Sequence, residues 1–220
     1  MRILRVVDLS RPINSGMQVY PGDPAPRVRQ VSAVESDGFW LHEVVIGSQT
    51  GTHVDAPAHV LTGAGDTGTI AVEDLVATAH IVDLSACGDR EIVGVDRLSD
   101  VLGRCRPGDA VLLRFGWDRF DGDQRAWSHP GLAEAAAHAL VAAEISFIGT
   151  DAASIDCHDS EVLAAHHVFA SAGVPIVENL AHLDEVTWPE PLVVVGMLPF
   201  AHLDGAPARV LALDVESGPR

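Results

Sequence analysis

The sequence has few of the residues that define several large protein classes. It contains three cysteines, Cys87, Cys105 and Cys157, and no Cys-x-x-Cys pair. This excludes a zinc site built from thiolates and is typical of a reducing compartment. No apolar stretch approaches the roughly 20 residues that span a bilayer, and the first residues become charged too soon for a secretory signal. We therefore expect a cytoplasmic protein.

Positive charge is also scarce. The 220 residues include 14 lysine and arginine residues against 31 aspartate and glutamate residues, which gives a formal net charge of −17. Nucleic acids and anionic membrane surfaces attract clustered basic residues, so we expect neither as a partner. Carboxylates that converge on one point would instead retain cations.

The apolar patterning predicts one domain of mixed class over residues 1–220, because hydrophobic residues make up 47% of the chain and can form a sizeable core. Strands are expected at residues 3–10, 27–34, 39–49, 79–85, 110–117, 145–151, 174–180, 191–198 and 208–215. Helices are expected at residues 95–104, at 130–143 with Pro130 in the first turn, and at 161–173 with Gly173 at the end. This order of elements is typical of an α/β or α+β domain.

The segment SQTGTHVDAPAH, residues 48–59, contains two histidines and an aspartate within seven positions. In an extended chain, one face would carry Gln49, Gly51, His53 and Asp55. Pro57 ends such a strand, and a turn after it would bring His59 back toward the others. Imidazole and carboxylate groups bind divalent transition metals such as zinc or manganese, so the segment is a candidate metal site.

Three ligands are too few to complete a metal site, and residues 165–180 contain further side chains that could bind a metal. His166 and His167 fall in a predicted helix, and Glu178 lies at the end of an apolar strand. A buried carboxylate is costly there unless it is paired or bound to a metal. The alternative places Glu178 at the solvent end of its strand and residues 48–59 in an ordinary polar hairpin. A His–Asp pair that serves a serine nucleophile has no GxSxG elbow to support it.

Several blocks together resemble one family. TGTHVDAPAH (50–59) resembles the HxGTHxDxPxH signature of the metal-dependent cyclase superfamily, which includes bacterial kynurenine formamidase and isatin hydrolase. Further blocks resemble that family in the same order: VYPGDPAP (19–26), GTDAASID (149–156), AHH (165–167) with VENL (177–180), and LDGAPARVLAL (203–213). The resemblance implies a mixed-sheet α/β domain of the swivelling β/β/α type. It also implies a homo-oligomer, a dimer or tetramer, with a short N-terminal arm that can reach a neighbouring subunit.

The resemblance implies a metal centre of one or two divalent ions, Zn²⁺ or Mn²⁺. His53 and Asp55 would bind metal, with Asp55 bridging two ions. His166 would bind the second ion, and Glu178 would contact both. We expect Asp156 only to organise a turn through backbone hydrogen bonds.

Other positions of the resembling blocks imply further roles. His59 would be the general acid/base, and Tyr20 would line the substrate pocket, where formamidases usually carry tryptophan. Gln49 occupies the place of the signature's first histidine. Its carbonyl oxygen can bind metal, but oxygen donors suit manganese or magnesium better than zinc. Gln49 would therefore shift the metal preference, weaken the binding site of one ion or leave that site empty. We assign no role to Asp204.

These roles imply a metal-dependent hydrolase of a small amide or cyclic amide, with N-formylkynurenine as the first candidate and tryptophan catabolism as the setting. Metal-activated water would attack the carbonyl, and His59 would protonate the departing nitrogen. Two other classes remain open. One is a metal-dependent cyclase or dehydratase that acts on a secondary metabolite, and the other is a non-catalytic binding protein with a degenerate metal site.

Overall fold

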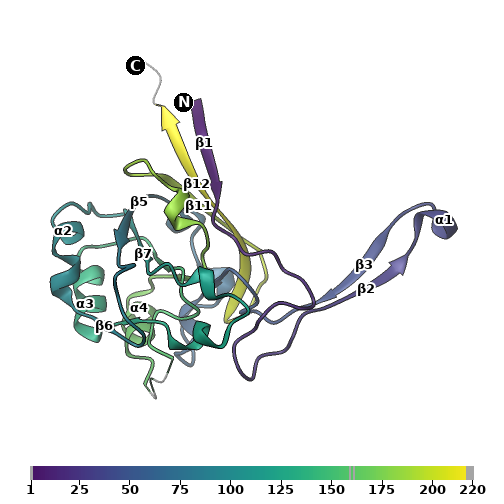
Figure 1. The fold of residues 1–220 in the computed structure, drawn as a ribbon, viewed down its shortest axis with the longest axis horizontal. Helices are drawn as coiled ribbons and strands as arrows, with labels where there is room; N and C mark the ends of the chain where they lie inside the picture. The colour runs from purple at the N-terminus through teal and green to yellow at the C-terminus, as the bar shows by residue number, and fades with distance from the viewer. Residues whose placement is uncertain (1, 159, 161, 217–220) are drawn as a thin grey trace.

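The computed structural model describes residues 2–158, 160 and 162–216. Its main sheet closes on itself. Its strands are β1 (Arg2–Asp8), β4 (His53–Asp55), β5 (Val76–Asp83), β7 (Ala110–Arg114), β9 (Ile148–Thr150), β10 (Ile176–Glu178), β11 (Leu192–Met197) and β12 (Gly205–Glu216). Their order is β1-β12-β11-β5-β7-β9-β10-β4, and β4 also pairs with β12. The strands from β12 round to β4 therefore form a closed, barrel-like ring. β1 extends it at the edge, beside β12 (Figure 1).

The sheet is mixed, with parallel strands in the centre and antiparallel strands at the closure. β5, β7, β9 and β10 run parallel to their neighbours in this series, whereas β4 is antiparallel to both β10 and β12. Residues 110–113 of β7 are 0% exposed, as expected for a central strand that is covered on both faces. The expected α/β class with a mixed sheet is confirmed.

Alternate residues of β7 belong to two different hydrophobic clusters. Val111 and Leu113 belong to a cluster that includes buried side chains of the helices α3 (Glu134–Ala142) and α4 (Ala164–Ala172). Ala110 and Leu112 belong to a second cluster made largely of residues from the other strands of the ring. The period of two along the strand places the core on both faces of the sheet.

Short elements connect this frame. The helix α2 (Ser99–Leu102) and a parallel pair, β6 (Ile92–Val93) with β8 (Gly131–Leu132), lie beside the helices. Single 3-10 turns are η1 (Pro57–His59), η2 (Thr67–Thr69), η3 (Val72–Leu75), η4 (Val95–Leu98), η5 (Asp118–Phe120), η6 (Gln124–Ser128) and η7 (Leu183–Glu185). Within the described ranges, no helix is both long and apolar enough to cross a membrane.

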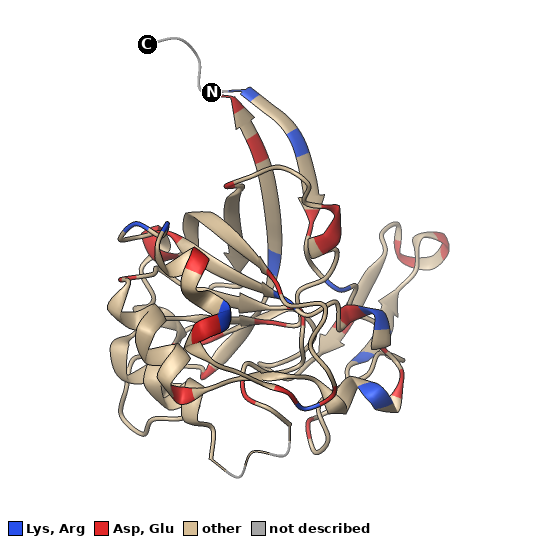
Figure 2. Cartoon of the chain, turned by 60° about the vertical axis from the view of Figure 1, so that its left-hand side comes forward, with Lys and Arg blue, Asp and Glu red and all other residues tan. Residues whose placement is uncertain are grey.

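A hairpin stands away from the barrel as an arm. It consists of β2 (Arg27–Ser32) and β3 (Leu41–Val45), with the short helix α1 (Val34–Asp37) at its tip (Figure 1). Acidic residues are spread over many elements, and the basic residues are scattered among them (Figure 2).

Four local expectations were wrong. The strand expected at 39–49 ends at Val45, and Gly51 has a φ of 67°, which breaks any extended face shared with Gln49. The helix expected at 130–143 begins at Glu134, because residues 131–132 form β8 instead. The helix expected at 161–173 begins at Ala164, but it does end at Gly173 in the left-handed conformation.

Candidate metal and catalytic site

Strand β4 places the motif of residues 48–59 at the closure of the sheet. His53 is opposite Glu178 of β10 on one side and opposite Pro207 of β12 on the other. His53 and Asp55 share one face because side chains alternate along a strand, while Val54 points into the core. The side chains of His53, Asp55 and Glu178 are buried, with 3–5% exposed. Glu178 is therefore not at the solvent end of its strand.

The ring of His53 is oriented by the backbone before it. Its Nδ1 lies 2.8 Å from the carbonyl oxygen of Gly51, and a carbonyl can only accept, so Nδ1 carries the proton. The lone pair of Nε2 then faces two carboxylates, 3.5 Å from Asp55 Oδ1 and 3.6 Å from Glu178 Oε2. This is the orientation of a metal-binding histidine.

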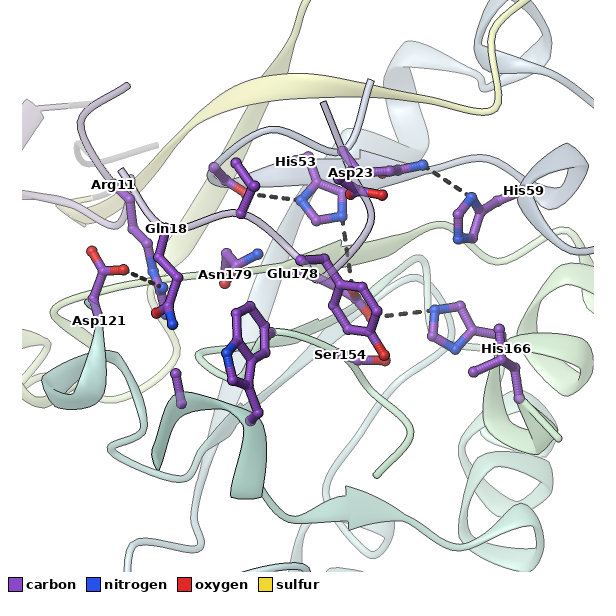
Figure 3. A pocket seen from close by; sticks show the side chains of 18 residues that line it. Arg11, Gln18, Asp23, His53, His59, Asp121, Ser154, His166, Glu178 and Asn179 are labelled. Atoms are coloured by element: carbon purple, nitrogen blue, oxygen red, sulfur yellow. Dashed lines mark hydrogen bonds and ion pairs between the residues drawn. The ribbon is translucent and has the colours of Figure 1, made fainter. Parts of the chain in front are cut away.

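His166 is held in the same manner from the opposite side. Its Nδ1 donates to Asp156 Oδ2 at 2.7 Å. Its Nε2 lies 3.4 Å from Asp55 Oδ2 and 3.3 Å from Glu178 Oε1. Each carboxylate thus presents one oxygen to His53 and the other to His166. Figure 3 shows Glu178 between the two rings.

Asp156 does more than organise a turn. Its carboxylate accepts from the backbone N–H groups of Ala165 and His166, at 2.9 and 3.0 Å, and so satisfies the first turn of α4. Burial would raise the pKa of Asp156, but the hydrogen bonds with His166 and Ala165 hold it below its ordinary value. Asp156 therefore fixes both the start of the helix and the tautomer of His166.

The four donor groups fit a divalent cation. Glu178 Oε1 accepts from the N–H of Ile155 at 2.7 Å, whereas both oxygens of Asp55 are buried without a hydrogen-bond partner among the described residues. Separations of 3.3–3.6 Å are long for hydrogen bonds. They match the roughly 3.4 Å between ligands in a tetrahedron with bonds of about 2.0–2.1 Å.

The pKa shifts of these groups indicate an excess of negative charge at the site. Burial would lower the pKa of His166, but its hydrogen bond to Asp156 and the nearby carboxylates of Asp55 and Glu178 raise it well above the ordinary value. Burial would raise the pKa of Asp55, but the adjacent rings of His166 and His53 lower it. The buried carboxylates therefore require a cation, which is either a proton on histidine or a metal ion.

His59 follows β4 in the turn η1, and the predicted return of this residue toward the others is confirmed. A ligand atom of His59 lies with those of Asp55 and His166 within 4.8 Å of one another. Its Nδ1 lies 3.1 Å from Asp204 Oδ2. Burial would raise the pKa of Asp204, but the hydrogen bonds with His59 and Gln49 lower it.

Gln49 joins this second group through its amide nitrogen. Nε2 donates to Asp204 Oδ2 at 2.9 Å and lies 3.0 Å from His59 Nδ1. Gly205 makes room for the amide, since a Cβ there would lie 2.6 Å from Gln49 Nε2. Oε1 is buried and has no hydrogen-bond partner in the described part of the chain, so it is the atom of Gln49 left to contact a cation.

A cavity of about 260 Å³ opens beside these groups. His53, His59 and His166 line it, and Tyr20 lies in its wall. The Tyr20 ring meets the Trp127 ring edge-on, with the centroids 5.5 Å apart. The cavity therefore joins the candidate metal donors to an aromatic wall.

Sequence reasoning missed the contributions of Asp156 and Asp204. Both lie within blocks that resemble the family, 149–156 and 203–213, and this was the available signal. Their partners are 10 and 145 residues away, so no local spacing shows the contacts.

Comparisons with known proteins identify the family of the chain. The model of the Cyclase family matches residues 7–157. The chain belongs to the Cyclase family. Kynurenine formamidase from Salinibacter ruber is 28% identical over 213 residues, which cover 96% of this chain and 98% of the relative.

Two solved structures extend the likeness to the whole fold. A predicted metal-dependent hydrolase from Bacillus stearothermophilus is 31% identical, with a TM-score of 0.80 and coverage of 96% of this chain and 98% of the other. Isatin hydrolase A from Ralstonia solanacearum is 26% identical, with a TM-score of 0.84 and coverage of 95% and 91%.

Substituting Asp156 tests its positioning role. We expect Asp156→Asn to weaken metal binding roughly 10- to 100-fold, because the amide cannot hold the His166 tautomer as the carboxylate does. The change should also lower the unfolding free energy by about 1 kcal/mol through the first turn of α4. Metal titration and thermal unfolding measure the two effects. Asp74→Asn, at an exposed aspartate, is the matched control and should change neither; an unaltered metal affinity in Asp156→Asn would contradict the role.

Proposed function

We propose that this protein is a metal-dependent hydrolase of a small amide or cyclic amide. The observation that carries the proposal is the convergence of His53 Nε2 and His166 Nε2 on the carboxylate oxygens of Asp55 and Glu178. The resemblance to a kynurenine formamidase, an isatin hydrolase and a predicted metal-dependent hydrolase supports the same reaction class. N-formylkynurenine is the first substrate to try.

The donor sets suggest how the chain would hold the metal. His53, Asp55 and Glu178 would bind one ion. Asp55 and Glu178 would also offer their other oxygens, with His166, to a second ion. Nitrogen and carboxylate donors suit Zn²⁺ and Mn²⁺, and an oxygen from Gln49 would favour Mn²⁺. Either ion, when bound, supplies a Lewis acid that polarises a carbonyl and lowers the pKa of water.

His59 is the proposed general acid/base. If Nδ1 donates to Asp204, the other ring nitrogen can accept a proton and later give it to the departing amine. The Asp204 carboxylate would then stabilise the imidazolium that forms. Gln49 donates to the same oxygen of Asp204 and so helps to hold that carboxylate beside the ring. Tyr20 would form part of the substrate wall.

A cyclase or dehydratase is the second candidate, and membership of the Cyclase family favours it. Such a reaction could use the same metal donors and His59 without water as the nucleophile. Product mass separates the two candidates, because hydrolysis adds one water and cyclisation does not. A non-catalytic protein would instead bind no metal, and the buried carboxylates of the site argue against that.

We further propose a homo-oligomer, a dimer or tetramer, in which the arm packs against another copy. Phe39, Trp40 and Leu41 on the arm are 48–68% exposed, which is unfavourable for apolar side chains in water. Free Cys87, Cys105 and Cys157 support a cytoplasmic location, where thiols stay reduced. Scattered basic residues (Figure 2) and a net charge of −17 support a small-molecule partner rather than nucleic acid or an anionic membrane.

The function is tested with His59→Ala after reconstitution with zinc and, separately, manganese. We expect the variant to retain its metal and to lose about 10²- to 10⁴-fold in kcat for N-formylkynurenine, the usual contribution of a general acid/base. Absorbance follows deformylation, and elemental analysis gives the metal content. Equal loss of metal and turnover would make His59 a ligand instead. Turnover that does not depend on metal in the unsubstituted protein would contradict the proposed function.

Asp55→Asn tests the metal centre without any substrate. Removing a buried negative charge should abolish metal binding, yet the metal-free variant should unfold at a temperature equal to or above that of the metal-free original protein. Zinc or manganese should raise the unfolding temperature of the original protein only. Thermal unfolding with and without a chelator measures this. A variant that still gains stability from metal would argue against Asp55 as a ligand.

The oligomer is tested with Trp40→Ser on the arm. We expect the molar mass in solution to fall toward that of the monomer, as measured by light scattering coupled to size-exclusion chromatography. Val72→Ser is the matched control, because Val72 is 75% exposed but lies outside the arm. An unchanged mass in Trp40→Ser would exclude Trp40 as an essential part of the interface.

A further inference from the structure

Arg11 is a buried cation at the end of the cavity away from His59 and His166 (Figure 3). Its side chain is 12% exposed, and it is the one arginine that lines the cavity within the described residues. Burial lowers the pKa of Arg11, although Asp121, Asp118 and Asp151 act in the opposite direction. A guanidinium in such a position is costly unless its donors are used.

The position of Arg11 is tied to the candidate metal donors. Its backbone N–H donates to Thr52 Oγ1 at 2.9 Å. The same hydroxyl donates to the carbonyl oxygen of Asn179 at 2.6 Å. Thr52 precedes His53 and Asn179 follows Glu178, so the backbone of Arg11 is fixed relative to both candidate ligands.

Only some of the guanidinium nitrogens of Arg11 have partners among the described residues. Nη2 donates to the carbonyl oxygen of Asp151 at 3.1 Å, and Nη1 lies 3.4 Å from Asp121 Oδ1. Nε is buried and has no hydrogen-bond partner among the described residues. The Asp121 side chain is 44% exposed, so this carboxylate can turn into solvent at little cost if another anion takes its place.

The cavity between the two ends suits a flat molecule. The Asn179 amide lies between Arg11 and Glu178 (Figure 3). Asn179 has a φ of 57°, a conformation that asparagine tolerates better than most residues. Tyr20 and Trp127 supply an aromatic wall. The lining thus offers donor groups at one end, aromatic rings at its side and the candidate metal donors at the other end.

We propose that Arg11 and Asn179 form a carboxylate subsite. It binds an anionic group that the substrate carries at the end opposite its scissile amide, and this group replaces Asp121 as the partner of Arg11. The inference rests on the proposed function and narrows its substrate class to small, flat amides that bear a carboxylate.

The test compares two matched substrates, 4-formamidobenzoate and its uncharged analogue 4-formamidobenzamide, with the metal-loaded enzyme. Arg11→Gln should lower kcat/KM for the benzoate by roughly 10- to 100-fold, as expected for hydrogen bonds to a charged group. The benzamide should change less than about threefold. Arg119→Gln is the matched control, because Arg119 lies near Asp121 in sequence but does not line the cavity. Equal losses for both substrates, or none, would overturn the subsite.

Asp121→Asn keeps the proposal testable if Arg11→Gln does not fold. Removing the competing carboxylate should raise kcat/KM for the benzoate several-fold and leave the benzamide unchanged. Circular dichroism and the unfolding temperature establish that each variant is folded. The proposal fails if Asp121→Asn alters both substrates alike or neither of them.

Direct binding separates failure of the subsite from failure of the proposed function. Isothermal titration calorimetry with the chelator-treated protein gives Kd for the same two compounds without turnover. Tighter binding of the benzoate that is lost in Arg11→Gln would support the subsite even if neither compound is hydrolysed, and the hydrolase proposal is then decided separately by the N-formylkynurenine assay. Equal binding of both compounds would overturn the subsite whatever the activity.

Discussion

The pairing of β4 with both β10 and β12 is the constraint on which the site depends. This three-residue strand closes the ring, and its register sets His53 opposite Glu178. A shift of one residue would turn His53 and Asp55 into the core and Val54 toward the donors, so the apolar core on the other face fixes the chemistry on this one. Loops can vary around the cavity, because the donors on β4 and β10 lie on a closed backbone.

Negative charge is the second organising feature. Asp55, Glu178 and Asp156 are all buried at one place, in a chain with a net charge of −17. Such a group is unfavourable unless a cation compensates it, which makes folding stability and cation binding linked properties of the same residues. At the far end of the cavity the charges are reversed, because the buried cation Arg11 is compensated by Asp121, whose side chain is 44% exposed.

The sequence pattern predicted those parts of the structure that depend on residues close together in the chain. The α/β class, most strands and the grouping of His53, Asp55 and His59 followed from alternation and from Pro57. The pattern could not predict that residues 131–132 pair with residues 92–93, because the partner strand is remote. Nor could it assign Asp156 and Asp204, which act through contacts to His166 and His59 made only in the folded chain.

Gln49 shows why a signature position is best understood through its contacts. The extended face expected for residues 49–55 would have aimed this side chain along with His53 and Asp55. Gly51 turns the chain instead, and the amide donates to Asp204 beside His59. An amide cannot take up a proton near neutral pH, so it donates to Asp204 at any pH at which the protein is folded. The glutamine therefore links His59 to the residue that precedes β12. Its Oε1, which has no hydrogen-bond partner among the described residues, is the atom of Gln49 that could favour a hard metal ion.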